Sequence, residues 1–301
     1  MGKTLNLLPL LFICFSSCFI KKNSDRFNFY KDDLPGMVKI DSNLYVDYSE
    51  IDNFFWLEYI YWNERVFGAN SKEYLESIPD STVWFNESCL LIFSEYYLRH
   101  PSYRKYPVVG ISQKQIEQFC KWRSDRIFEL LLIREKVITA NPSQTADDYF
   151  SIDNYFNGKY NNIQPNLSIK TYPVFRLPKY EEWIKTKLLF EDLNKKNLNS
   201  CNKRYCHYKF KKEDLTTVFN ITPCLNDSMI KEPTEPTSCY NNKKVGFHIT
   251  GNVSEWLLDS NKIIGGNWKD TVDTYFDIPL VANFPKEYIG FRCISEWKER
   301  K

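Results

Sequence analysis

The stretch "TGNVSEWLLDSNKIIGGNW", Thr250–Trp268, carries the strongest information about the fold of this chain. It belongs to the most glycine-rich part of the sequence. Half of the ten glycines fall here, at Gly246, Gly251, Gly265, Gly266 and Gly290. Glycine has no Cβ, so it permits tight turns and close approach of two backbones. The segment His248–Ser295 therefore predicts short strands joined by turns, and not a helical bundle.

Helix signals precede this segment. Asp52 is a good N-cap for the apolar-periodic stretch "NFFWLEYIYW". Ser112 and Gln115 form a capping box, in which the hydroxyl and the amide each satisfy one free backbone N–H of the next helix. Pro178 suits the first turn of a third helix in "FRLPKYEEWIKTKLLF". Together with a strand-like alternation in "LYVDY", these signals indicate one α+β domain with much irregular loop.

Composition argues against nucleic acid as a partner and leaves sugar or peptide binding open. The net charge of +2 gives no field that would attract nucleic acid, so none is expected. The aromatic content of 17% would suit a sugar- or peptide-binding surface. A general bias of the chain toward Asn, Lys, Ile, Phe and Tyr explains the same number, and we prefer that explanation to glycan binding.

The first 18 residues are typical of an export signal. Lys3 precedes a short apolar run, Leu5–Phe15, that is below the roughly 20 residues needed to cross a bilayer. "FSSC" resembles a bacterial lipobox, with Cys18 as the lipidated residue, and residues 19–43 would then be a tether. An ordinary cleaved signal peptide is the alternative. The prediction is a lipid-anchored protein of the bacterial cell envelope, on its periplasmic or cell-surface side.

Four motifs stand in an order that resembles one enzyme family. They are "EIDNFFWLEY" (Glu50–Tyr59), "YPVVGISQKQIEQFCKW" (Tyr106–Trp122), "FRLPKYEEW" (Phe175–Trp183) and "GNVSEW…GGNW…IGFRC" (Gly251–Cys293). Together they resemble the formylglycine-generating enzyme, or sulfatase-modifying factor, family. The resemblance implies a fold related to C-type lectins over residues 44–301, with insertions near 136–172 and 194–244.

The resemblance also implies a loss of chemistry. The enzymes of that family bind copper through two cysteines after the GG motif, and here Asp270 and Tyr275 stand in their places. Carboxylate and phenol oxygens are poor ligands for Cu(I), so no copper and no catalytic residues are expected. "FCKWRSDRIFELLLIRE", Phe119–Glu135, is similar to the gliding-motility lipoproteins of the same family. That likeness implies a non-catalytic scaffold that binds envelope proteins, as in gliding or secretion machinery; the alternative is a diverged oxidase acting on a peptide cysteine.

The remaining expectations concern cysteines and calcium. The resemblance pairs Cys120 with Cys293 as a disulfide, and two buried thiols are the alternative. A zinc site is disfavoured in the group Cys201, Cys206, His207, Cys224 and Cys239, because the spacing is not that of a structural zinc site. The family's calcium ligands would fall on His248, Gly251, Val253 and Glu255. Three of these can still donate oxygen, whereas His248 offers nitrogen, a poor ligand for calcium.

Overall fold

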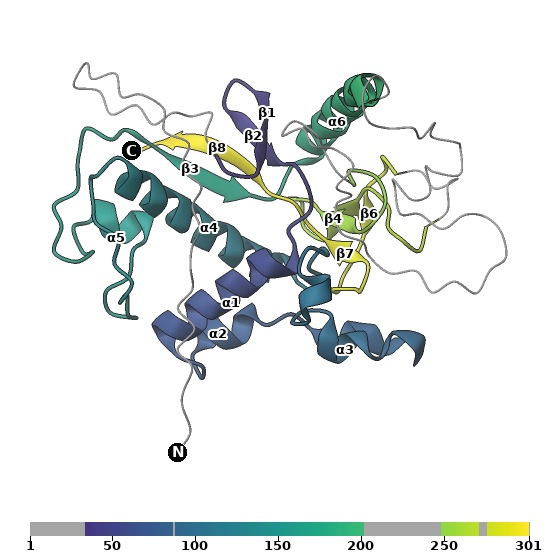
Figure 1. Ribbon diagram of the computed structural model, residues 1–301, viewed down its shortest axis with the longest axis horizontal. Helices are drawn as coiled ribbons and strands as arrows, with labels where there is room; N and C mark the ends of the chain where they lie inside the picture. The colour runs from purple at the N-terminus through teal and green to yellow at the C-terminus, as the bar shows by residue number, and fades with distance from the viewer. Residues whose placement is uncertain (1–33, 87, 202–247, 271–275, 301) are drawn as a thin grey trace.

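The computed structural model describes residues 34–86, 88–201, 248–270 and 276–300. Their strands form two four-stranded sheets, ordered β1-β2-β8-β3 and β6-β5-β4-β7. The first sheet comprises β1 (Met37–Asp41), β2 (Leu44–Asp47), β3 (Thr171–Arg176) and β8 (Ile294–Glu299). All its neighbours are antiparallel, and β8 lies between β2 and β3. The last strand therefore joins the beginning of the described chain to its middle (Figure 1).

Strand β1 corrects one boundary taken from the sequence. It lies within residues 19–43, which were expected to be a tether, so the folded domain begins before residue 44. Leu34 is buried against Tyr45 and Trp297. Gly36, with φ +76°, forms the turn that leads into β1, and its carbonyl accepts from Tyr48 N. Pro35 and Gly36, within the expected tether, form a turn inside the domain.

The second sheet consists of very short strands, as the glycine pattern predicted. They are β4 (Ser254–Trp256), β5 (Lys262–Ile264), β6 (Leu280–Val281) and β7 (Ile289–Gly290). β4 pairs with β7 in parallel and with β5 antiparallel, and β6 adds to β5. Figure 1 shows this sheet beside the end of the first one.

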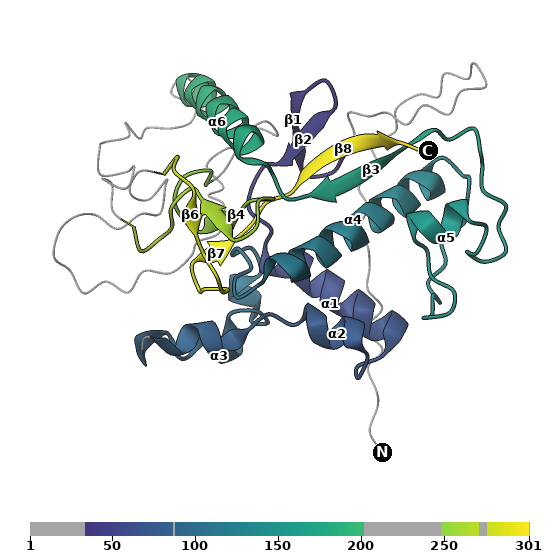
Figure 2. The same cartoon turned by 180° about the vertical axis from the view of Figure 1, so that it is seen from behind.

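The three helices expected from the sequence are confirmed. They are α1 (Asn53–Phe67), α4 (Gln113–Arg134) and α6 (Tyr180–Cys201). The Asp52 carboxylate accepts from Phe55 N at 2.8 Å, and Ser112 and Gln115 form the expected capping box. Seen from either side, α4 runs along one face of the first sheet and α6 lies toward the other (Figures 1 and 2). Within the described residues, no helix has both the length and the apolar character needed to span a membrane.

Shorter helices complete the described chain. They are α2 (Lys72–Ser77), α3 (Phe93–Tyr96), α5 (Ile152–Phe156) and the 3-10 helices η1 (Ser81–Asn86), η2 (Ser88–Leu90) and η3 (Pro101–Tyr103). The segment containing η1, η2, α3 and η3 projects from one edge of the molecule in both ribbon views (Figures 1 and 2). It connects α2 to the loop that leads into α4.

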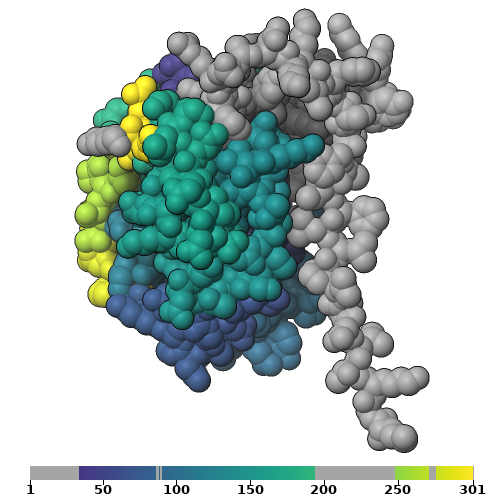
Figure 3. Space-filling view, turned by 90° about the vertical axis from the view of Figure 1, so that its left-hand side faces the viewer, coloured from purple at the N-terminus to yellow at the C-terminus, as the bar shows by residue number. Residues whose placement is uncertain are grey.

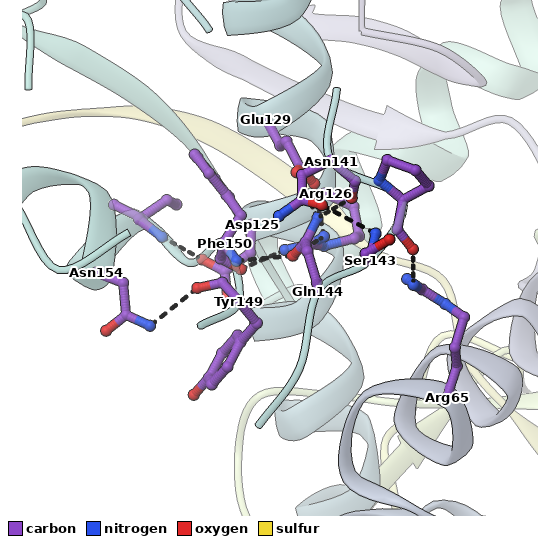
Figure 4. A network of polar contacts seen from close by, with 12 residues as sticks. Arg65, Asp125, Arg126, Glu129, Asn141, Ser143, Gln144, Tyr149, Phe150 and Asn154 are labelled. Carbon is purple, nitrogen blue, oxygen red and sulfur yellow. Dashed lines mark hydrogen bonds and ion pairs between the residues drawn. The ribbon is translucent and has the colours of Figure 1, made fainter. Parts of the chain in front are cut away.

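Residues 136–172, expected to be a surface insertion, form a second core with the outer half of α4. The aromatic and aliphatic side chains buried there include Phe128, Leu132, Phe150, Tyr155, Tyr160 and Ile169. A polar network fixes the segment to the helix. The Gln144 amide donates to Glu129 at 2.7 Å and accepts from Phe150 N at 2.7 Å, while Arg126 contacts Glu129 at 2.6 Å (Figure 4). The segment covers much of the face seen in Figure 3. It lies at the surface and is also part of the core.

Candidate functional site

A cleft lies where the Gly-Gly-Asn-Trp loop meets β6. Its volume is about 430 Å³, and its lining combines the loop with β6, the chain that follows β6 and Ile263 of β5. The lining residues are Ile263, Asn267, Lys269, Asp270, Leu280, Val281, Ala282, Asn283, Phe284, Lys286 and Tyr288. This is the place to which the sequence assigned the family's lost copper site.

Asp270, one of the two residues in the copper positions, bonds to its own loop. Its Oδ2 accepts from Asn267 N at 2.8 Å and from Asn267 Nδ2 at 2.9 Å. Burial raises the pKa of the Asp270 carboxyl, and the Asn267 hydrogen bond opposes this effect. A Cβ on Gly266 would lie 2.2 Å from the Phe276 ring and 3.2 Å from Asp270 Oδ2, so this close turn requires glycine. Tyr275 lies outside the described residues. Asp270 thus closes the loop as a hydrogen-bond acceptor.

The outer side of the cleft is an apolar edge strand. Among the strands that the structure describes, β6 pairs with β5 alone. Leu280, Val281 and Phe284 are exposed there, Val281 to 75%. Lys269 forms an ion pair with Glu287, and its ammonium lies over the Trp268 and Tyr288 rings at 4.9 and 5.5 Å from their centroids. An edge strand with exposed apolar side chains can accept an added strand.

Beneath the loop lies a buried ion pair between Glu255 on β4 and Arg292, which follows β7. Arg292 Nε donates to Glu255 Oε1 at 2.7 Å, and Trp183 Nε1 donates to Oε2 at 3.0 Å. Both partners are at most 1% exposed. Burial raises the pKa of Glu255 to about 7, although the neighbouring Arg292 acts to lower it. Through this pair and its contacts with the Asp47 and His248 carbonyls, Arg292 braces the chain beneath the loop.

The residues present do not fit the calcium ion that the resemblance implied. Both oxygens of Glu255 already accept hydrogen bonds, and the Arg292 guanidinium also donates to the His248 carbonyl at 3.2 Å. A cation bound by His248, Gly251, Val253 and Glu255 would therefore compete with a guanidinium. Among the described residues, neither ring nitrogen of His248 has a hydrogen-bond partner, and Nδ1 lies 3.7 Å from Glu50 Oε2. No cluster of three acidic, His or Cys side chains suited to a metal occurs in the described part of the chain.

Calcium is accordingly expected to leave the stability of the protein unchanged. The thermal midpoint should agree within error in millimolar calcium and in EDTA, because Arg292 already neutralises Glu255. Differential scanning fluorimetry measures this, with magnesium as the control for ionic strength. A calcium-specific rise in the midpoint would show that the cation displaces Arg292.

Cys120 on α4 and Cys293, just before β8, are brought together, but as thiols. Their sulfurs lie 3.6 Å apart and both side chains are buried. A disulfide requires about 2.05 Å, so the expected bond is not formed in this structure. Burial raises the pKa of the Cys293 thiol. Because the thiolate is the reactive form, oxidation of the native pair should be slow.

Oxidative refolding is expected to join the pair where oxidation of the folded protein does not. The bond would close a loop between residues 173 positions apart, and the chain-entropy model gives on the order of 5 kcal/mol for such a loop. Non-reducing peptide mapping after refolding with oxidised glutathione should recover a Cys120–Cys293 peptide. Protein kept folded throughout should yield both thiols alkylated after denaturation. Alkylated thiols in both samples would show that the pair does not form a disulfide.

Comparison with known proteins supports the family. The model of the "Sulfatase-modifying factor enzyme 1-like domain" matches residues 71–297. This chain belongs to that family, and it has its α+β fold as a single domain. No curated protein matches. Among solved structures, CarF shares 15% identity at a TM-score of 0.42, over 84% of this chain and 86% of its own. Treponema denticola variable protein 1 shares 14% at 0.38, over 84% of each chain.

Sequence reasoning missed part of the cleft and most of the buried charges. Leu280, Val281 and Phe284 follow the GG motif at a distance. The available signal for an edge strand was the short apolar run "IPLVANF", in which Pro279 disfavours a central strand. The Asp47–Arg123 pair, with two contacts of 2.7 Å, had no sequence signal because its partners are 76 positions apart. Cys18 and the cysteines considered for zinc, Cys206, Cys224 and Cys239, lie outside the described residues, and the side chain of Cys201 is also not described.

Proposed function

We propose that this protein is a non-catalytic binding member of its family, tethered to the envelope membrane and acting as a scaffold. The observation that supports this function best is the engagement of Asp270. The carboxylate in a copper position is held by Asn267, and a carboxylate is the wrong kind of ligand for Cu(I). What remains of the site is a cleft beside an exposed strand edge.

The occupant that suits this cleft is an extended segment of an envelope protein. A strand added to the outer edge of β6 would gain backbone hydrogen bonds, and its alternate side chains would contact Leu280 and Phe284. Lys286 lines the same cleft, so an acidic residue in the segment would find a cation nearby. This mode of recognition requires shape and backbone pairing, and no metal.

Site-specific crosslinking tests the proposal in intact cells. Benzoylphenylalanine at Phe284 should give a defined crosslink, and adding Val281→Asp should abolish it by placing a charge on the apolar edge. The matched control is the same crosslinker at Leu188, an exposed residue on α6, again with and without Val281→Asp. The same crosslinked product from both positions would contradict the proposal. Globomycin and Cys18→Ser test the lipid anchor separately, and unchanged membrane fractionation would refute it.

The alternative function, a diverged oxidase acting on a peptide cysteine, is favoured by the family membership of the fold. It is tested by titrating Cu(I) in competition with a colorimetric chelator and by assaying oxidation of a cysteine-containing peptide. Turnover that disappears when the metal is removed would overturn the non-catalytic function. Absence of both binding and turnover would support it.

A further inference from the structure

The segment around α3 is apolar on two faces. Leu90, Phe93 and Tyr97 point into a core that also contains Trp84 and Trp268. Leu91, Ile92 and Tyr96 lie between these positions, and together with Phe85 they are 42–61% exposed. We call the exposed residues the α3 surface. A helix that uses one apolar face for the core normally presents a polar face to water, so the α3 surface calls for a further partner.

The α3 surface is rigidly presented and protrudes. Trp84, Phe93 and Tyr97 contact one another with ring centroids 4.7–5.9 Å apart, and Tyr97 stacks on Tyr103. The segment stands out from the edge of the molecule in both ribbon views (Figures 1 and 2). A flat surface could therefore approach the α3 segment at this edge of the molecule.

Exposed basic residues follow α3 along the chain. Arg99, Arg104 and Lys105 come between the end of α3 and Tyr106, and Glu95 is the acidic residue of α3 itself. His100 and Tyr103 line a shallow hollow with Ile92 and Tyr96. Exposed aliphatic and aromatic side chains beside Arg and Lys are the combination that binds at the interface of an anionic bilayer. Tyrosine favours this depth because its ring is apolar and its hydroxyl is polar.

We propose that the α3 surface docks on an anionic lipid surface. Leu91, Ile92 and Tyr96 would enter the boundary between headgroups and acyl chains, while Arg99 and Arg104 would contact the phosphates. This contact is separate from the proposed lipid anchor at Cys18, and it orients the domain relative to the membrane. It is also independent of the cleft beside β6.

Vesicle partitioning of the full-length chain tests the docking. With phosphatidylglycerol-rich vesicles, Leu91→Ser/Ile92→Ser is expected to lower the partition coefficient about tenfold or more. Removing Arg99 and Arg104 together by Gln should lower it about fivefold per arginine, and only on anionic vesicles. The matched controls are Leu188→Ser, since Leu188 and Ile92 are both 61% exposed, and Lys159→Gln/Lys170→Gln. Unchanged thermal midpoints verify that the variants fold.

Hydrogen exchange reports on the α3 segment itself, so membrane binding by the apolar N-terminal residues does not affect the result. Peptides covering residues 88–105 should exchange more slowly on anionic vesicles than on phosphatidylcholine, and peptides from α6 should not change. Equal exchange on both vesicles would overturn the proposal. So would a monomer–dimer shift in sedimentation that Leu91→Ser/Ile92→Ser abolishes, because the surface would then bind a second copy of the chain. Both results leave the cleft crosslinking unaffected.

Discussion

Substitution of Glu255 by glutamine is expected to lower the free energy of unfolding by about 3–5 kcal/mol. The substitution leaves the guanidinium of Arg292 fully buried beside an amide that cannot balance its charge. Glutamine does not titrate and Arg292 keeps its proton at accessible pH, so the stability of this variant should be nearly flat from about pH 5 to 8. The wild type loses stability as pH rises through the raised pKa of Glu255, about 7, so the loss caused by the substitution should shrink over that range. Urea unfolding followed by tryptophan fluorescence measures it.

Substitution of Arg292 by methionine should behave differently, because the residue left behind can discharge. Burial already raises the pKa of Glu255 to about 7 with Arg292 present, and removing Arg292 removes the charge that opposes this rise. The folded state then holds a proton that the unfolded state, with a pKa near ~4.3, releases. Stability from this proton is fully present below the unfolded pKa and is lost as pH rises through the folded pKa. The stability of this variant should therefore keep falling above about pH 7, where that of the wild type levels off, so the destabilisation should grow from about pH 7 to 8.

The two single variants are distinguished by how steeply their free energy of unfolding changes with pH. Glu255→Gln/Arg292→Met removes both charges and should recover part of the stability that each single variant loses. Trp183 keeps a hydrogen-bond acceptor in that double variant, since the introduced glutamine retains a side-chain carbonyl. Equal pH slopes for the two single variants would show that Glu255 does not take up a proton when its partner is removed.

The local signals in the sequence predicted the helix starts because capping is decided within four residues. Asp52 and Ser112 cap their helices as expected. The apolar spacing in α1 grouped Phe55 with Trp56, Tyr59 and Ile60; the last three are buried, whereas Phe55 is exposed. The glycine-rich end likewise predicted short strands, since turn formation is also local. Family resemblance supplied the fold, which periodicity alone could not.

Local sequence patterns did not predict the parts of the fold that depend on residues distant in the sequence. "MVKID" forms β1 because it pairs with β2. The sequence of such a short stretch after Pro35-Gly36 does not predict that pairing. The polar residues of 136–172 suggested an exposed insertion, yet Phe150, Tyr155 and Tyr160 are buried against α4. In such a segment a few aromatic side chains decide the packing, although polar residues dominate the composition.

The candidate site shows the same limit. Motif matching singled out Asp270, which lies in the loop, and Glu255, which lies on β4, but it could not show what each carboxylate binds. Asp270 accepts from Asn267, and Glu255 is held by Arg292 and Trp183. Trp183 comes from another motif and Arg292 from a distant part of the same one, and they determine that Glu255 is engaged by a guanidinium where the resemblance placed a possible calcium ligand. Whether a carboxylate can bind a metal therefore depends on the other residues that contact it, and the spacing of motifs does not specify these residues.

Replacement of Trp56 by alanine is expected to lower the free energy of unfolding by about 3–5 kcal/mol. Trp56 is fully buried in α1, stacks on Phe119 of α4 at 5.1 Å and meets Phe291 edge-on at 5.9 Å. Its Nε1 donates to Ser77 O at 2.9 Å. The indole therefore joins α1, α2 and α4 to the chain beside Arg292, and removing it opens a cavity among all four.

Two further variants separate the contributions of the ring and its N–H group. Trp56→Phe keeps an aromatic ring against Phe119 but leaves the buried Ser77 carbonyl without a donor, so a loss of about 1–3 kcal/mol is expected. Tyr61→Ala, at a 63% exposed position of the same helix, should change stability by no more than about 0.5 kcal/mol. Chemical denaturation should show the largest loss for Trp56→Ala, a smaller one for Trp56→Phe and the smallest for Tyr61→Ala. If Trp56→Ala and Tyr61→Ala lost the same stability, aromatic packing would not be what fixes α1 and α4 to the segment before β8.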